Sequence, residues 1–247
     1  MPRSSPLAGH FVLLGSAIPR VIGLLAGLTL ILSILAAVTA RNGLPGLVEW
    51  CALVPALVLH GQLWRVVTWV FFESGPLGLI IGCIGLVFFG RDLTHAWGPG
   101  RFLLTYIAAA STTGLVVSGI SQVWPAVLGL KYIGPWPLVT AMIVAWAILH
   151  PHRDVFVYFV LPLRGRSLIY ATLLGTLLFA LMSPTGIAGS LPHFVAQGLA
   201  LLYMRETYLG NLWLRMRYRF HTRGWRRRAS HLRPVERMED EPPKWLH

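Results

Sequence analysis

The sequence predicts an all-α, polytopic membrane protein with a bundle of six transmembrane helices. Of its 247 residues, 55% are hydrophobic and only 12% are charged, whereas soluble domains contain roughly 25% charged residues. Long apolar runs without a charge recur along the chain, and Lys and Arg gather in alternate connections between them. We therefore expect one transmembrane domain over 21–204, between a short N-terminus at 1–20 and a basic tail at 205–247.

Six segments are apolar over about the length that a membrane span requires, which is around 20 residues. The expected spans are about 21–40, 74–90, 102–119, 133–150, 167–182 and 189–204. The first run is longer than the roughly 7–15 apolar residues of a cleaved signal peptide, so we expect an uncleaved helix. Residues 41–73 are broken by proline, glycine and Arg65, which favours a partly embedded loop.

The distribution of basic residues predicts the orientation of the bundle. The N-terminus, 91–101, 151–166 and the tail contain 2, 2, 3 and 11 Lys and Arg residues. The intervening connections contain only Arg41, Arg65 and Lys131. Because positively charged connections stay in the cytoplasm, both termini are expected to be cytoplasmic. A compact core of six spans favours a bacterial inner (plasma) membrane.

Two glycine-containing stretches stand out within the spans. The fourth span opens with Gly134-Pro135-Trp136-Pro137, where proline is tolerated because first-turn N–H groups lack helical partners. The second span has glycines three or four residues apart, at Gly75, Gly78, Gly82 and Gly85. Such a pattern lines one face of a helix and lets a neighbouring helix approach closely. We expect close packing there.

Short motifs follow one another in a definite order. They are Trp64-Arg65 after the first span, Phe88-Phe89-Gly90 with Trp97-Gly98 and Arg101-Phe102-Leu103 between the second and third, Gly134 before the fourth, Leu161-Pro162 before the fifth, and His193 in the sixth. Over roughly 20–205, this order resembles the rhomboid family of intramembrane serine proteases. The resemblance implies a rhomboid-like bundle in which Trp64, Arg65 and Gly134 belong to structural motifs.

The catalytic set that the resemblance implies is incomplete. The family's Gly-x-Ser-Gly motif corresponds to Gly134-Pro135-Trp136-Pro137, so Trp136 replaces the nucleophile. Gly78 and Gly82 stand where active members have the histidine and asparagine that stabilise the oxyanion, and His193 matches the catalytic histidine. Tryptophan offers only an indole N–H donor, and glycine has no side chain. We therefore expect no intact catalytic site.

The remaining candidate residues each allow more than one interpretation. His193 is either a neutral core residue hydrogen-bonded by Gln197 one turn on, a client contact, or a surviving base. Trp136 is either an interfacial anchor or a plug in the former active site. Thr140 and Ser190 could substitute as nucleophile, or serve as ordinary helix and cap residues. Trp136, His193 and Gln197 are the candidates for client contact.

Two classes of function follow from these residues. The first is a non-catalytic rhomboid-like protein that binds transmembrane clients or partners. The alternative is a divergent rhomboid serine endopeptidase with a non-standard nucleophile. A transporter is less favoured, because no predicted span contains an acidic residue for ion coupling. No P-loop, GxGxxG, CxxC pair or HExxH motif occurs, so we expect neither a cofactor nor a metal.

The tail contains 11 of the 21 Lys and Arg residues of a chain whose formal net charge is +12. Between 205 and 233, basic and aromatic residues interleave next to a membrane span, which predicts binding to anionic lipid headgroups. Nucleic-acid binding uses the same residue types but is not expected here. Residues 236–247 are acidic and contain proline, which is typical of disorder.

Overall fold

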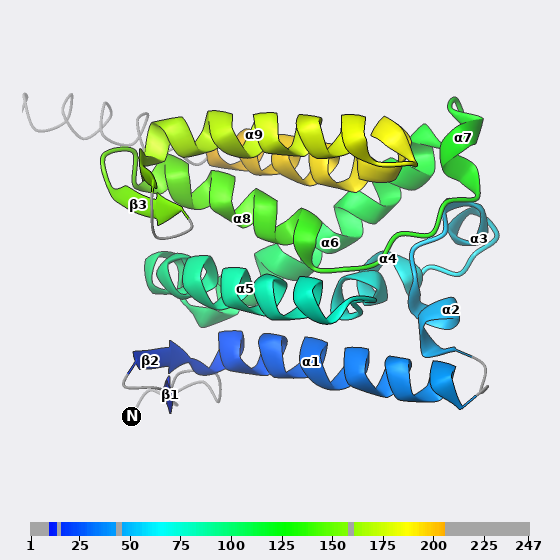
Figure 1. Ribbon diagram of the computed structural model, residues 1–247, viewed down its shortest axis with the longest axis horizontal. Helices are drawn as coiled ribbons and strands as arrows, with labels where there is room; N and C mark the ends of the chain where they lie inside the picture. The colour runs from blue at the N-terminus through cyan, green and yellow to red at the C-terminus, as the bar shows by residue number, and fades with distance from the viewer. Residues whose placement is uncertain (1–9, 14–15, 43–45, 158–160, 206–247) are drawn as a thin grey trace, which may run out of the picture. The chain divides into compact units, whose positions relative to one another are not determined.

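The computed structural model describes residues 10–13, 16–42, 46–157 and 161–205 (Figure 1). The chain divides into a compact unit at 1–204 and a second unit at 205–247. Apart from its first residue, the predicted lipid-binding tail lies outside the described residues. The architecture below is that of the first unit.

The first unit is a helical bundle. Its main helices are α1 (Arg20–Arg41), α5 (Pro76–Trp97), α6 (Pro99–Ile120), α8 (Trp136–Leu149), α9 (Gly165–Met182) and an unlabelled helix over Gly186–Arg205, orange in Figure 1. Within the described residues, five helices are long and apolar enough to cross a membrane, and α8 is shorter. The prediction of an all-α, multi-pass membrane protein is confirmed, whereas six full spans are not observed.

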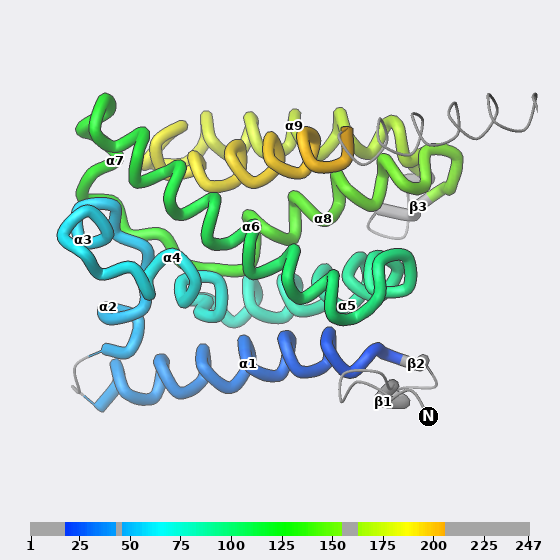
Figure 2. Tube along the Cα trace, turned by 180° about the vertical axis from the view of Figure 1, so that it is seen from behind, coloured from blue at the N-terminus to red at the C-terminus, as the bar shows by residue number. Residues whose placement is uncertain are grey.

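The fourth expected span, 133–150, is the one whose helix is shorter than a membrane span requires. Helix α8 has 14 residues, which is about 21 Å at 1.5 Å per residue, shorter than a hydrocarbon core of about 30 Å. It starts late because Gly134, with φ of 112°, turns the chain just before Trp136, and Tyr132 pairs with Leu53 in an isolated β-bridge. Nine of its residues are buried, so α8 is an internal helix. It lies between α5 and α9 both in Figure 1 and in the opposite view of Figure 2.

The connection between the second and third spans is also shorter than the expected 91–101. Helix α5 continues to Trp97, and Gly98, with φ of 83°, is the single residue before α6. Helix α5 continues past residue 90 because the carboxylate of Asp92, near its end, has hydrogen-bond partners on other elements of the bundle. Asp92 Oδ2 accepts hydrogen bonds from Trp146 Nε1 at 2.8 Å and from Arg153 Nη1 at 2.9 Å.

Several small elements were not apparent from hydropathy. The loop after α1 contains α2 (Leu47–Cys51), α3 (Pro55–Leu59), α4 (Arg65–Thr68) and the 3-10 helix η1 (Trp69–Phe71), and α7 (Pro125–Leu128) follows α6. Two antiparallel hairpins also form, β1 (His10–Leu13) with β2 (Ser16–Pro19), and β3 (Asp154–Val157) with β4 (Leu161–Arg164). Both hairpins are short, and an isolated two-stranded hairpin is only marginally stable in water.

A buried arginine organises the loop between α1 and α5. Arg65 is only 4% exposed. Its Nη1 donates to the carbonyls of Glu49, at 2.8 Å, and Ala52, at 2.7 Å, and its Nε donates to Gln62 Oε1 at 2.6 Å. The adjacent Trp64 donates from Nε1 to the Trp50 carbonyl at 3.1 Å. This pair therefore joins α2 to α4 and gives the interrupted segment a definite shape.

The basic residues of this unit divide unevenly between the two ends of the bundle (Figure 1). Among the described residues, six arginines belong to elements or connections at the end that holds the start of α1 and the β3–β4 hairpin: Arg20, Arg91, Arg101, Arg153, Arg164 and Arg166. The opposite end has Arg41, the buried Arg65, and Lys131, which is paired with Glu49. The uneven distribution of basic residues along the sequence thus becomes an uneven distribution between the two ends of the bundle.

Replacing Arg65 should test its part in the fold. We expect Arg65→Ala to lower the free energy of unfolding by about 2–4 kcal/mol, because charged hydrogen bonds are worth about 1.5–3 kcal/mol and three acceptors lose their donor. Arg65→Lys should fall in between, since an ammonium lacks the planar fork. Thermal unfolding of the detergent-solubilised protein measures both. The exposed Arg41→Ala is the control, and an equal loss in that variant would contradict the assignment.

Candidate functional site

The mouth of α8, where the resemblance places the nucleophile, is closed by tryptophan and proline. Gly134 N donates to the Trp69 carbonyl at 3.0 Å, which fixes the turn before the helix. A Cβ built on Gly82 would lie 3.2 Å from Pro135 Cγ and 3.8 Å from Trp136 Nε1. The half-buried Trp136 indole therefore lies against the glycine face of α5 and packs on the core. Two of the positions singled out from the sequence thus meet in space.

A carboxylate also lies at this mouth, and it was missed in the sequence. A Cβ built on Gly78 would lie 3.1 Å from Glu73 Cδ, and one built on Gly134 would lie 2.8 Å from Glu73 Oε2. Ser74 N donates to Glu73 Oε1 at 3.0 Å, and Glu73 N donates to Ser33 Oγ at 2.9 Å. One feature of the sequence could have pointed to this carboxylate: Glu73 is the only acidic residue between Glu49 and Asp92.

Partial burial decides the electrostatics of Glu73. Desolvation raises the pKa of its carboxyl above the ordinary value, and hydrogen bonds from the backbone of Ser74 and Gly75 oppose that shift. The space beside Gly78, where active rhomboids are expected to place an oxyanion donor, is therefore occupied by an acceptor. An oxyanion needs donors, so this mouth is electrostatically unsuited to stabilise one.

His193 lies in the Gly186–Arg205 helix and faces α9. Its ring centroid is 6.2 Å from that of Phe179. Its Nδ1 is buried without a well-formed hydrogen bond in the described chain, and the backbone of Ser190 is the polar group that interacts with the imidazole. The hydrogen bond from Gln197, one of the three interpretations of His193, is not observed between these two described residues. Gln197 is fully buried and donates from Nε2 to Thr176 Oγ1 of α9 at 2.7 Å.

The two substitute nucleophiles are not activated by this histidine. Thr140 donates to the Pro137 carbonyl at 2.9 Å, an ordinary bond within α8. Ser190 is fully buried, and its Oγ has no hydrogen-bond partner among the described residues. Neither hydroxyl is hydrogen-bonded to His193 in that part of the chain. Nucleophilic catalysis requires a base within hydrogen-bond reach, and this arrangement does not provide one.

One face of the Gly186–Arg205 helix is nevertheless polar and buried. Ser190, His193 and Gln197 follow one another at helical spacing, and each has a buried atom without a partner in the described residues: Ser190 Oγ, His193 Nδ1 and Gln197 Oε1. Buried unpaired polar atoms are costly. No group of three or more His, Cys, Asp or Glu side chains could hold a metal ion within the described ranges.

The pH dependence of stability should report the buried state of Glu73. Its raised pKa means that the neutral form is favoured on folding, so this contribution is complete below the ordinary pKa of 4.5 and is lost as pH rises through the folded pKa. Glu73→Gln should therefore melt higher than wild type at a pH of about 8 and equally near a pH of about 4. Thermal unfolding of both proteins at the two pH values measures the difference.

Glu49→Gln is the matched control for that measurement. Lys131 holds the pKa of Glu49 below its ordinary value, so any contribution of Glu49 has the opposite sign and is lost as pH falls. This exposed pair contributes little. If Glu73→Gln were less stable than wild type at alkaline pH, the carboxylate would be a stabilising charged acceptor and the desolvation argument would be wrong.

Comparison with known proteins agrees with the membrane fold. Residues 22–225 match a family model described as "Eukaryotic integral membrane protein (DUF1751)". Over 80 residues, the chain is also 31% identical to rhomboid protease GluP of Bacillus subtilis (strain 168). That alignment covers 32% of this chain but only 16% of the relative, so the chain spans a small part of that protease.

These findings support the rhomboid-like relationship and the multi-pass membrane assignment. The expected bacterial inner membrane gains no support from a family whose description is eukaryotic. The family match extends over most of the chain, from α1 past the last described helix. The chain therefore belongs to the family of integral membrane proteins described as "Eukaryotic integral membrane protein (DUF1751)".

Proposed function

We propose that this protein is a non-catalytic, rhomboid-like membrane protein that binds transmembrane clients or partners. The main support is the mouth of α8, where the Trp136 indole lies 3.8 Å from a Cβ built on Gly82 and where Glu73 lies beside Gly78. An indole cannot attack a carbonyl, and a carboxylate does not donate to an oxyanion. On this proposal, Trp136 is a plug in a former active site.

The buried polar face behind α9 is the proposed client contact. In the free protein, the Gln197–Thr176 hydrogen bond and the ring contact between His193 and Phe179 hold the Gly186–Arg205 helix against α9. Ser190, His193 and Gln197 still have unpaired polar atoms. A client helix with a hydroxyl or amide side chain can satisfy these atoms, and interhelical hydrogen bonds in membranes contribute about 0.6 kcal/mol on average.

A divergent serine endopeptidase is the second candidate. Ser190 Oγ and His193 Nδ1 are both buried and unpartnered on one helix face within the described chain. A change of rotamer could bring a hydroxyl and an imidazole together at this i, i+3 spacing. The oxyanion donors would still be lacking, and removing one such donor costs about 10²–10³ in kcat. This explains why catalysis is the less favoured proposal.

Activity assays separate the two candidates. We expect the purified protein to leave a generic transmembrane substrate uncut and to bind no serine-directed fluorophosphonate. The reason is that losing one group of a catalytic set that acts as a unit can cost about as much activity as losing the whole set. Cleavage or labelling that disappears in Ser190→Ala or Thr140→Ala, and also in His193→Ala, would establish the protease instead.

Crosslinked membrane partners should then be recovered with wild type, Trp136→Ala, His193→Ala and Gln197→Leu. We expect the last two variants to lose partners at temperatures where each is still folded, whereas the exposed Tyr170→Phe on α9 keeps them. Retention of every partner in His193→Ala and Gln197→Leu would reduce this polar face to a packing role.

The orientation of the bundle is proposed from its charge asymmetry. The arginine-rich end, with the start of α1 and the β3–β4 hairpin, would face the cytoplasm, since basic connections are retained there. The basic 205–233 segment would then lie on the same side and bind anionic lipid headgroups. Reporter fusions at residue 247 should read out the cytoplasm, and insertions at 125 and 186 should read out the other side. A reporter at 247 on the far side would refute the orientation.

A further inference from the structure

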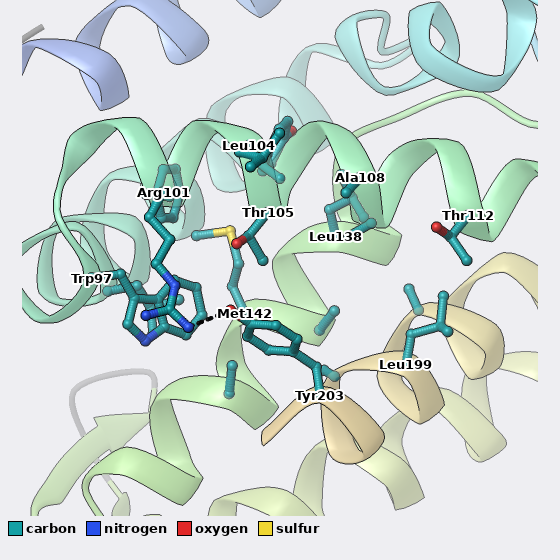
Figure 3. A pocket seen from close by; sticks show the side chains of 18 residues that line it. Trp97, Arg101, Leu104, Thr105, Ala108, Thr112, Leu138, Met142, Leu199 and Tyr203 are labelled. Carbon is teal, nitrogen blue, oxygen red and sulfur yellow. Dashed lines mark hydrogen bonds between the residues drawn. The ribbon is translucent and has the colours of Figure 1, made fainter. Parts of the chain in front are cut away.

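A cavity of about 390 Å³ lies away from the mouth of α8, between α6 and the Gly186–Arg205 helix, with α8 as its floor (Figure 3). Its walls are apolar, and six of its lining residues are alanines: Ala108, Ala109, Ala141, Ala145, Ala196 and Ala200. Short side chains on three helices leave the space open. We call this cavity the alanine groove. Trp136, His193 and Gln197 do not line it.

The alanine groove opens along the surface of α6. Leu104, Ala108 and Thr112 line it on successive turns of the helix, and all three are exposed, Leu104 by 71%. Residues four apart share one face of a helix. In a membrane, that face meets hydrocarbon chains rather than water, so the molecules with direct access to the groove are lipids and other transmembrane helices.

The length of the groove matches one leaflet. From Arg101 to Thr112, the twelve residues of α6 rise about 16 Å, at 1.5 Å for each of eleven steps. Half of a hydrocarbon core of about 30 Å is about 15 Å. One acyl chain of the leaflet at the Arg101 end can therefore run along the whole groove. Sites for small ligands have volumes of roughly 300–1,000 Å³, a range that includes the cavity.

The groove ends at a cation. Arg101 is exposed and donates from Nη2 to Tyr203 OH at 3.1 Å, and Trp97 packs edge-to-face on the Tyr203 ring with centroids 5.9 Å apart (Figure 3). A guanidinium has five N–H donors and pairs with phosphate through parallel hydrogen bonds. Trp and Tyr are enriched at the level of the headgroups. Arg101 therefore lies where the phosphate of a lipid in the groove would be.

We propose that the alanine groove is a binding site for one anionic phospholipid, with an acyl chain along α6 and its phosphate on Arg101. The charge and the leaflet length select a phospholipid over a client helix, which needs no cation at one end. The site is independent of client binding at the Ser190–His193–Gln197 face, since the two share no lining residue.

Photocrosslinking in nanodiscs tests this site with the full-length protein. The discs contain phosphatidylcholine and a small fraction of phosphatidylglycerol whose acyl chain carries a diazirine. Peptide mass spectrometry should find adducts concentrated on 104–112 and 196–203. The same diazirine on phosphatidylcholine should label these peptides at least threefold more weakly, because its choline ammonium already neutralises the phosphate that Arg101 would pair with.

Two pairs of variants make the test specific. Arg101→Gln should lower groove labelling by phosphatidylglycerol at least threefold, while Arg91→Gln, an exposed arginine at the same end but outside the groove, should not. Ala108→Phe should block the opening, and Leu115→Phe, on exposed α6 surface outside the lining, should not. The basic tail is present in all four, so differences between them come from the groove. If Ala108→Phe does not fold, the arginine pair alone decides.

Three results would overturn the proposal. Adducts spread evenly over the exposed faces of α1 and α9 would show that the groove does not select a lipid. Equal labelling of Arg101→Gln and Arg91→Gln would remove the headgroup contact. With a photoreactive amino acid placed at position 108 instead, adducts with another polypeptide and not with lipid in intact membranes would show that a client helix is the occupant.

Discussion

The close approach of α5 to α8 is the contact on which the rest of the bundle depends. A Cβ on Gly85 would lie 2.7 Å from Val139 Cγ1, and one on Gly82 would lie 3.2 Å from Pro135 Cγ. On another side of α5, a Cβ on Gly90 would lie 2.7 Å from Ile22 Cδ1 of α1. In lipid, helices associate through packing rather than the hydrophobic effect, so glycine on α5 lets both neighbours come close.

That packing also decides what remains of the rhomboid-like site. Because α8 fills the glycine face of α5, this face is occupied by the chain's own Pro135, Trp136 and Val139 and not by an outside helix. Glu73 then covers the first turn of α5 beside Gly78. The bundle's support does not depend on polar groups at these positions, since the contacts are glycine against aliphatic side chains, and the Asp92–Trp146 and Arg65 hydrogen bonds lie elsewhere.

Hydropathy predicted the five long helices to within a few residues, because the composition of a membrane span reflects its lipid surroundings. The exception is the end of α5, which runs on to Trp97. It did not predict where α8 starts, since this depends on the positive φ of Gly134 and the Tyr132–Leu53 bridge. Long-range contacts explain the other misses. The carboxylate of Glu73 reaches Gly134, and Gln197 turns to Thr176 rather than to His193. Spacing along one helix cannot reveal which neighbouring helix a polar side chain meets.

The two regions of this bundle differ in the chemistry they offer a membrane. The face behind α9 has unpaired polar atoms at Ser190, His193 and Gln197, which favours a partner with matching donors and acceptors. The alanine groove has almost no polar lining apart from the Arg101 end, which favours a hydrocarbon chain. Both regions use the Gly186–Arg205 helix, but Ala196, Ala200 and Tyr203 line the groove while Gln197 turns to α9. A lipid in the groove would therefore brace this helix without blocking its polar face.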